Sequence, residues 1–372
     1  MSDTKQLVAR YEPWLLRLIV VLFVLLGWSY ALATPVFEAS DELWHYPLIK
    51  FLADGNALPV QAFDPDEAGP WKQQASQPPL YYWLAAATTF WINTDDLPQV
   101  RWLNPHVDNG IITADGNINL VVHDPDANPW QGTLLAVRLI RLLSVLLGAC
   151  TVYLTYCIAR EVAPNRPEIA LGAAAINAFT PMFLFISGAV NNDNLVVPLA
   201  SLALWLMIRL VRGEQELSGT QRNSHHAPRR HHSHHHHIYL LLLGLIIGLA
   251  GLTKVTALGL LALAWGTIFI WLWQRSDQQV TIKTLMFLVV RTVGYWLLVI
   301  GPFVVVAGWW YVRNIRLYGD LLGWNAFIAV LGQRESPASL AQLWDERHGF
   351  LQAFWGCSVA SMCQCPAGFT RY

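Results

Sequence analysis

Charged residues are scarce in this chain of 372 residues. Asp, Glu, Lys and Arg make up 13% of it, about half the share found in an ordinary soluble domain. The formal net charge is −1, so no bulk positive charge attracts nucleic acid, and we expect no nucleic-acid partner. The five cysteines form no disulfide framework, because Cys150 and Cys157 lie inside one apolar run and the others crowd the C-terminus. The first apolar run lacks a small-residue cleavage site, which favours a retained anchor over a cleaved signal peptide.

What the chain does contain is hydrophobic sequence, 54% of its residues, gathered in blocks. A membrane-spanning helix needs about 20 consecutive apolar residues. The blocks therefore predict an all-α polytopic membrane protein. We expect seven spans: Trp14–Ala33, Leu134–Ala159, Ile169–Val190, Leu195–Leu210, Ile238–Thr253, Thr256–Trp273 and Thr284–Ala307.

The apolar run Leu80–Ile92 is too short to be an eighth span. As a helix it covers about 20 Å, less than the roughly 30 Å hydrocarbon core, so we expect an interfacial or re-entrant helix. Seven spans place most Lys and Arg residues on one side of the membrane together with the N-terminus, which predicts a cytoplasmic N-terminus in the plasma (inner) membrane. The His-rich segment 212–237 then lies in the cytoplasm, either as a linker or as a metal-binding tract.

The same topology divides the chain into five segments. Residues 34–133 form a large first extracytoplasmic loop, with a short helix expected from Asp41 to Ala53. A long ordered loop of this kind tends to be functional. The predicted segments are 1–33, the N-terminus and first span; 34–133, the loop; 134–310, the remaining spans; 311–356, the start of a further extracytoplasmic segment; and 357–372, a tail of different character.

An acidic pair and a histidine follow the first span. Asp41, Glu42 and His45 stand where a span meets water. Ionisable groups are costly near lipid, so their presence there indicates a function, such as acid–base or metal chemistry. Residues 41 and 45 are four apart and share a face of a helix. The plainer alternative is helix capping, since acidic residues favour the first turn of a helix.

Further polar groups reach the same face of the membrane. Asn191, Asn192 and Asp193 connect the third and fourth spans as a tight turn that also offers ligands to a cation or to sugar hydroxyls. Arg138 and Arg141 share a face near the outer end of the second span, where they bind a phosphate or reach lipid headgroups. Lys254 stands at the tip of a helical hairpin and points to an anion or to water.

Two carboxylates beside several cations indicate transfer from a phosphate-activated donor. A carboxylate takes the proton of the acceptor, while the cations, with or without a divalent metal ion, stabilise the leaving phosphate. The contrasting hypothesis is a transporter or flippase of a lipid-linked anionic substrate, which needs the cations but no base. A third reading is an inactive, truncated membrane product.

These motifs resemble the GT-C superfamily of membrane glycosyltransferases, including the protein mannosyltransferases of family 39, whose first outer loop opens with an acidic pair. They resemble more closely a bacterial family with an Asp-Glu-x-x-His loop motif, matched by Asp41-Glu42-Leu43-Trp44-His45. Also matching are Gln77-Pro78-Pro79-Leu80, Arg138 to Ser144, Asn191-Asn192-Asp193, Gly251 to Lys254 and Tyr318-Gly319-Asp320. Related families usually carry His or Lys where Gln77 stands.

The resemblance implies a glycosyltransferase with a GT-C-like seven-span module and a polyprenyl-phosphate sugar as donor. The acceptor is a lipid, a glycan or a protein, and transfer inverts the sugar outside the plasma membrane. Asp41 carries over as the base, with Glu42 assisting it or binding a metal ion. Substrate binding falls to His45, Arg138, Arg141, Asn191, Asn192 and Lys254. Asp193 matches a metal-binding acidic loop, which makes Mg²⁺ or Mn²⁺ a candidate cofactor.

The end of the chain does not fit the resemblance. Relatives continue beyond this length with further spans, and residues 357–372 match nothing expected after Phe354-Trp355-Gly356. We therefore expect a frameshifted tail and a C-terminally truncated chain. An unshifted reading of the resequenced gene would refute this.

Overall fold

The computed structural model describes residues 2–39, 41–105, 119–221, 233–276, 281–333 and 336–354. All the regular elements in these ranges are helices, joined by turns and loops. The described residues also contain an isolated antiparallel bridge between Leu103 and Val121. The predicted all-α fold is confirmed. The predicted tail 357–372 and residues 222–232 of the His-rich segment lie outside the described residues.

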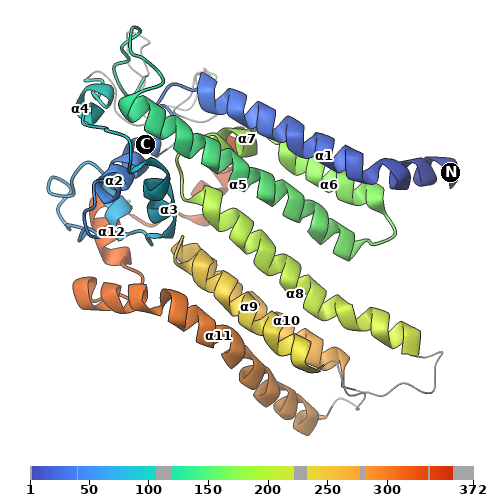
Figure 1. Cartoon of the computed structure of the whole chain (residues 1–372). Coiled ribbons are helices and arrows are strands. Elements are labelled where there is room, and N and C mark those ends of the chain that lie inside the picture. The colour runs from blue at the N-terminus through green and yellow to red at the C-terminus, as the bar shows by residue number, and fades with distance from the viewer. Residues whose placement is uncertain are drawn as a thin grey trace.

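Long helices form a bundle, and shorter ones gather at one of its ends (Figure 1). The N-terminal end of α1 lies at the opposite end of the bundle. The helices are α1 Ser2–Ala33, α2 Glu42–Ala53, η1 Lys72–Ser76, α3 Leu80–Thr89, α4 Leu97–Val100, α5 Gly132–Val162, α6 Pro167–Phe179, α7 Pro181–Ser187, α8 Asp193–Gln221, α9 Ser233–Gly251, η2 Val255–Leu258, α10 Gly259–Gln274, α11 Ile282–Tyr318, α12 Trp324–Leu331, α13 Leu340–Asp345 and α14 Arg347–Phe354.

In the described part of the chain, five helices are long and apolar enough to cross a membrane, and six if a bent pair counts as one span. The five lie within α1, α5, α8, η2–α10 and α11. The apolar part of α9, His236–Gly251, is shorter than a full span. The protein is thus a multi-pass membrane protein, but the predicted count of seven spans is not confirmed.

The predicted third span, Ile169–Val190, is not one straight helix. It is broken into α6 and α7, which meet at an angle of 62°. Thr180 between them is extended, and Pro181 opens α7. Proline supplies no amide hydrogen, clashes with the preceding turn and disfavours helical backbone in the residue before it, so the helix ends at this point. The bend carries the chain towards Asn191.

Helix α11 is longer than the predicted span Thr284–Ala307. Its 37 residues reach about 55 Å, well beyond the roughly 30 Å hydrocarbon core, and it crosses the predicted boundary at residue 310 without a break. Its last turns hold the loop after α2: Arg313 donates to the carbonyl of Pro59 at 2.8 Å, and the amide of Gln61 donates to the Tyr318 hydroxyl at 3.0 Å.

Helix α3 begins where the predicted re-entrant helix begins. Its ten residues reach about 15 Å, too little to cross the bilayer. Its first amide, at Leu80, donates to the carbonyl of Leu252 at 3.0 Å, which ties α3 to the end of α9. Helix α9 in turn packs closely on α11: a Cβ atom at Gly244 would lie 2.2 Å from the Val299 carbonyl oxygen. These contacts fix the loop helices against the bundle.

Candidate functional site

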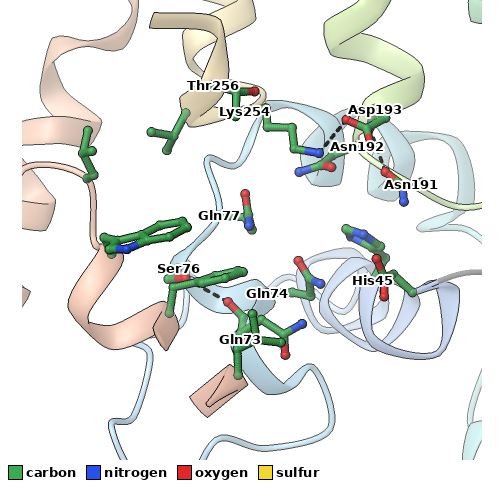
Figure 2. A pocket seen from close by; sticks show the side chains of 16 residues that line it. His45, Gln73, Gln74, Ser76, Gln77, Asn191, Asn192, Asp193, Lys254 and Thr256 are labelled. Atoms are coloured by element: carbon green, nitrogen blue, oxygen red, sulfur yellow. Dashed lines mark hydrogen bonds and ion pairs between the residues drawn. The ribbon is translucent and has the colours of Figure 1, made fainter. Parts of the chain in front are cut away.

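A cavity of about 370 Å³ opens among the short helices at this end of the bundle. One part of its lining is mainly polar and comes from α2 and η1 with their adjoining residues, the α7–α8 turn and the segment after α9 (Figure 2). The other part is apolar and comes from α12 and from Leu322 in the turn before it. The lining residues are Asp41, His45, Gln73, Gln74, Ser76, Gln77, Asn191, Asn192, Asp193, Lys254, Val255, Thr256, Leu322, Trp324, Phe327 and Leu331.

Asp41 stands immediately before α2 with a left-handed backbone (φ 49°). It occupies the N-cap position, yet its side chain makes no capping hydrogen bond. The capping alternative is therefore not what the structure shows, and the carboxylate remains on the cavity. Burial in this recess raises the pKa of Asp41, the positive charge of Lys254 lowers it, and the negative charge of Asp193 raises it.

His45 lies one turn into α2 and is almost completely buried. Its Nδ1 atom is 2.8 Å from the Tyr82 hydroxyl, which donates to Oε1 of Gln74 at 3.2 Å. Burial, assisted by the charge of Lys254, lowers the pKa of His45 to about 3. His45 is therefore a neutral imidazole at neutral pH, held by one ring nitrogen.

The turn between α7 and α8 presents three polar side chains to the cavity. Asn191 Oδ1 accepts a hydrogen bond from the backbone amide of Asp193 at 2.9 Å, which closes the turn. The Asn192 side chain is 2% exposed and its Nδ2 atom has no hydrogen-bond partner. A buried amide hydrogen without a partner is costly, and a polar ligand in the cavity would satisfy it.

Lys254 faces the same turn from the other side of the cavity (Figure 2). Its ammonium group is 2.5 Å from Oδ1 of Asp193, and both side chains are partly exposed. An ammonium group carries three protons, so the pair with Asp193 orients Lys254 and leaves protons for another anion.

Helix α12 supplies the apolar wall, and the turn before it is held rigidly. The Asp320 carboxylate accepts backbone hydrogen bonds from Leu322 at 3.1 Å, Trp324 at 2.5 Å and Asn325 at 3.1 Å. The rings of Trp324 and Phe327 stack with centroids 5.2 Å apart and an interplanar angle of 11°. The cavity therefore has an aromatic side in addition to its polar groups.

Glu42 and Arg141 do not line the cavity. Both side chains are fully buried and form an ion pair at 2.8 Å. Arg141 also donates to the carbonyls of Ala31 at 2.8 Å, Thr34 at 2.6 Å and Pro35 at 3.0 Å. Burial raises the pKa of Glu42, while the charge and hydrogen bonds of Arg141 oppose the rise. This geometry joins α5 to the end of α1 and the start of α2, and places neither group on the cavity.

Arg138 also lies away from the cavity. It donates to the carbonyl of Pro129 and lies over the Trp130 ring, with 5.1 Å between the guanidinium carbon and the ring centroid. Its predicted phosphate contact and the alternative contact with lipid headgroups both stay predictions.

Some cavity residues had no counterpart among the predicted site residues. Gln73, Gln74 and Ser76 come from η1, and the aromatic wall comes from α12. The sequence did contain a signal for the first group, since these polar residues directly precede Gln77, which already stood out in the Pro-Pro-Leu motif. The turn at Asp320 was a weaker signal for the second.

The described residues contain no group of three or more His, Cys, Asp and Glu side chains placed to hold a metal ion. The carboxylate of Asp193, the predicted metal ligand, is engaged by Lys254. These residues do not form a metal centre, so the Mg²⁺ or Mn²⁺ site stays a prediction and we derive no step through it. The cavity itself combines a carboxylate, a neutral imidazole, an ammonium group and amides.

A family model described as dolichyl-phosphate-mannose-protein mannosyltransferase matches residues 128–318, just over half of the chain. The match includes the α7–α8 turn and Lys254, while Asp41, His45 and η1 precede it. Searches of curated proteins and of solved structures find no match. The family match confirms the predicted superfamily of GT-C membrane glycosyltransferases and, at that level, the predicted donor class of polyprenyl-phosphate sugars.

Proposed function

The chain belongs to the dolichyl-phosphate-mannose-protein mannosyltransferase family, and on that premise we propose that it transfers a hexose from polyprenyl phosphate to a hydroxyl group of an acceptor in the α2–α12 cavity. The observation that carries the proposal is the Asp41 carboxylate, which is free of any capping bond and shares one cavity with Lys254 and with the unpartnered amide of Asn192. A base, a cation and a hydroxyl-binding group are what this transfer requires.

Asp41 acts as the general base. Its carboxylate takes the proton of the acceptor hydroxyl as the acceptor oxygen forms a bond to C1 of the sugar. The bond between C1 and the phosphate oxygen breaks on the opposite face, so the anomeric configuration inverts. The bonding electrons leave with the polyprenyl phosphate. The raised pKa of Asp41 suits this role, because a base is most effective when its pKa approaches the working pH.

Lys254 stabilises the negative charge that develops on the leaving phosphate. Asp193 fixes the ammonium group through one contact, and its remaining protons face the donor. The amides of Asn191, Asn192 and Gln77 bind sugar hydroxyls, and the stacked rings of Trp324 and Phe327 receive the first isoprenoid units or the sugar face. One occupant with a charged centre and an apolar chain matches both sides of the cavity.

We place the reaction at the extracytoplasmic face of the plasma (inner) membrane, with the N-terminus in the cytoplasm. The family description supports mannose as the sugar and a protein as the acceptor, with a lipid or a glycan as the other acceptor classes. Glu42 and Arg141 take a scaffolding role in this proposal, because they are buried together away from the cavity.

The test is Asp41→Asn in membranes supplied with radiolabelled polyprenyl-phosphate-mannose and a Ser/Thr-rich peptide. Removal of the base lowers kcat by about 100-fold or more, while binding of the donor is retained. Asp95→Asn is the matched control, since Asp95 is an exposed carboxylate at the same end of the bundle and does not line the cavity. Unchanged transfer by Asp41→Asn would refute the assignment; donor translocation without transfer by the wild type would favour the transporter hypothesis.

A further inference from the structure

A chain of three buried hydrogen-bonding groups ends at the cavity. Gln74 belongs to η1, Tyr82 to α3 and His45 to α2, so three separate elements contribute one group each. Tyr82 is fully buried, and Gln74 and His45 are less than 5% exposed. His45 and Gln74 lie together on one side of the cavity, facing Lys254 and Asn192 across it (Figure 2).

The hydrogen bonds determine which nitrogen of His45 carries the proton. A tyrosine hydroxyl has one proton, and that of Tyr82 is donated to Oε1 of Gln74 at 3.2 Å. The oxygen of Tyr82 can then only accept from His45, whose Nδ1 lies 2.8 Å away. Nδ1 is therefore the protonated nitrogen, and Nε2 is left with a lone pair. Burial raises the pKa of Tyr82, so the hydroxyl keeps its proton.

The charged groups around His45 keep this arrangement at working pH. Asp41 precedes it on the same element, and Asp193 and Lys254 face it from the α7–α8 turn and from the segment before η2. The ring is neutral, because burial and the charge of Lys254 disfavour the imidazolium form. Nε2 is thus a hydrogen-bond acceptor throughout the physiological range.

Because Nε2 of His45 can only accept a hydrogen bond, its partner must be a group that donates one. The bridging phosphate of the donor carries no proton to give. If Asp41 removes the one hydroxyl proton of a Ser or Thr acceptor, as in the proposed function, that proton is not available to His45. The transferred sugar still offers several hydroxyl groups, and each can donate.

We infer that Nε2 of His45 accepts a hydrogen bond from a hydroxyl group of the transferred sugar, and that Tyr82 and Gln74 are positioning residues that hold the required tautomer of His45. This inference rests on the proposed function. It makes His45 a specificity-determining residue. A polyprenyl-phosphate sugar that lacks the hydroxyl leaves Nε2 buried and unpaired, and a site that pairs a substrate hydroxyl strongly rejects an analogue without it.

The experiment measures kcat/KM with polyprenyl-phosphate-mannose and with its 2-, 3-, 4- and 6-deoxy analogues. In the wild type one analogue is about 10- to 100-fold worse than the parent donor. In His45→Ala that penalty disappears, because the partner of the missing hydroxyl is gone. In Tyr82→Phe and Gln74→Leu it shrinks, whereas Gln74→Glu retains it, since a carboxylate still accepts from Tyr82. Tyr46→Phe, which removes a neighbouring buried hydroxyl, is the control.

A second readout separates the tautomer from the reaction. In protein labelled with ¹⁵N histidine, the signals lost in His45→Gln identify residue 45. They show a protonated Nδ1 and an unprotonated Nε2 in the wild type, and this pattern is lost in Tyr82→Phe. A deoxy penalty that persists in His45→Ala, or a protonated Nε2 in the wild type, overturns the inference. Absence of any transfer by the wild type instead refutes the proposed function.

Discussion

The ammonium group of Lys254 acts on two carboxylates in the cavity. It contacts Asp193 directly at 2.5 Å, and its charge also lowers the pKa of Asp41, against the rise caused by burial. A cation that lowers the pKa of a base widens the pH range in which the base is ionised. Lys254 thus bears on both partners of the proposed transfer, the base and the leaving phosphate.

We predict that Lys254→Met shifts the acidic limb of the pH profile of kcat/KM to higher pH. Without the positive charge, the pKa of Asp41 rises further, so a higher pH is needed to ionise the base. The rate also falls because the phosphate loses its cation. Lys254→Arg, which keeps the charge, is the control and leaves the limb near its wild-type position. A limb that stays in place or moves to lower pH in Lys254→Met would contradict the assignment of Asp41.

At the residue scale, sequence reasoning selected many of the groups that meet in the cavity. Asp41, His45, Asn191, Asn192, Asp193 and Lys254 all line it, although their roles there stay predictions. Arg141 shows why the rest could not be foreseen. Its spacing from Arg138 gave a shared helix face, but nothing in the sequence indicated that backbone carbonyls from residues 31 to 35 and the Glu42 carboxylate engage its guanidinium group.

At the scale of elements, the Glu42–Arg141 pair links three helices. One guanidinium group binds the end of α1, the connecting residues and the first residue of α2, and it belongs to α5. Breaking a fully buried ion pair by removing one partner leaves a charge uncompensated, which costs about 3–5 kcal/mol. The position of Asp41, immediately before Glu42, depends on this link.

We predict that Arg141→Lys and Glu42→Gln each lower the thermal stability of the detergent-solubilised protein. Lysine cannot reproduce the forked hydrogen bonds of arginine, and a neutral glutamine leaves the arginine charge unpaired. Because the two residues form one unit, the double variant loses less stability than the sum of the single losses. Arg138→Lys is the control and has a smaller effect. A Glu42→Gln variant of normal stability with abolished kcat would instead support the catalytic role first predicted for Glu42.

The sequence predicts a helix well where the length of an apolar run determines it. It predicts less well where a single residue, such as a proline, breaks the helix. The helix expected from Asp41 to Ala53 appears as α2, and α5 and α8 contain their predicted spans. The break within the predicted span Ile169–Val190 was not foreseen, although Pro181 was a visible warning. Helix α12 was not predicted, because eight residues after a long span carry too short a pattern to distinguish.

At the scale of the whole molecule, one end of the bundle carries α2, α3, α4 and α12 together with the cavity, and the N-terminal end of α1 lies at the other (Figure 1). The positive-inside rule predicts that the cavity end lies on the extracytoplasmic side. The segment after α10 lies at the end opposite the cavity, since α10 runs away from η2.

We predict opposite labelling of two single cysteines in a cysteine-free background. Ala57→Cys, on the exposed loop after α2, reacts with a membrane-impermeant maleimide in intact cells. Ser276→Cys, after α10, reacts only once the membrane is permeabilised. The extracytoplasmic assignment would be excluded if position 57 failed to react with the maleimide in intact cells, or if position 276 reacted and position 57 did not.

The number of spans shows where whole-molecule prediction reaches its limit. Hydropathy gives each apolar block the same weight, yet α9 has an apolar part shorter than a span, and α6 and α7 share one block around a 62° bend. Tertiary contacts decide how such segments lie: α9 is held between α8 and α11, where Gly244 permits close approach. Composition therefore established the membrane class, and packing established the arrangement.

The left-handed backbone of Asp41 (φ 49°) limits which amino acids this position can accept. Asp, Asn and Gly tolerate that conformation better than other residues. Glutamate would keep the negative charge but fits the backbone less well, and alanine would add conformational strain to the loss of charge. Among the three tolerated residues only aspartate carries a carboxylate, so the requirement for a base and the geometry of the main chain converge on one amino acid.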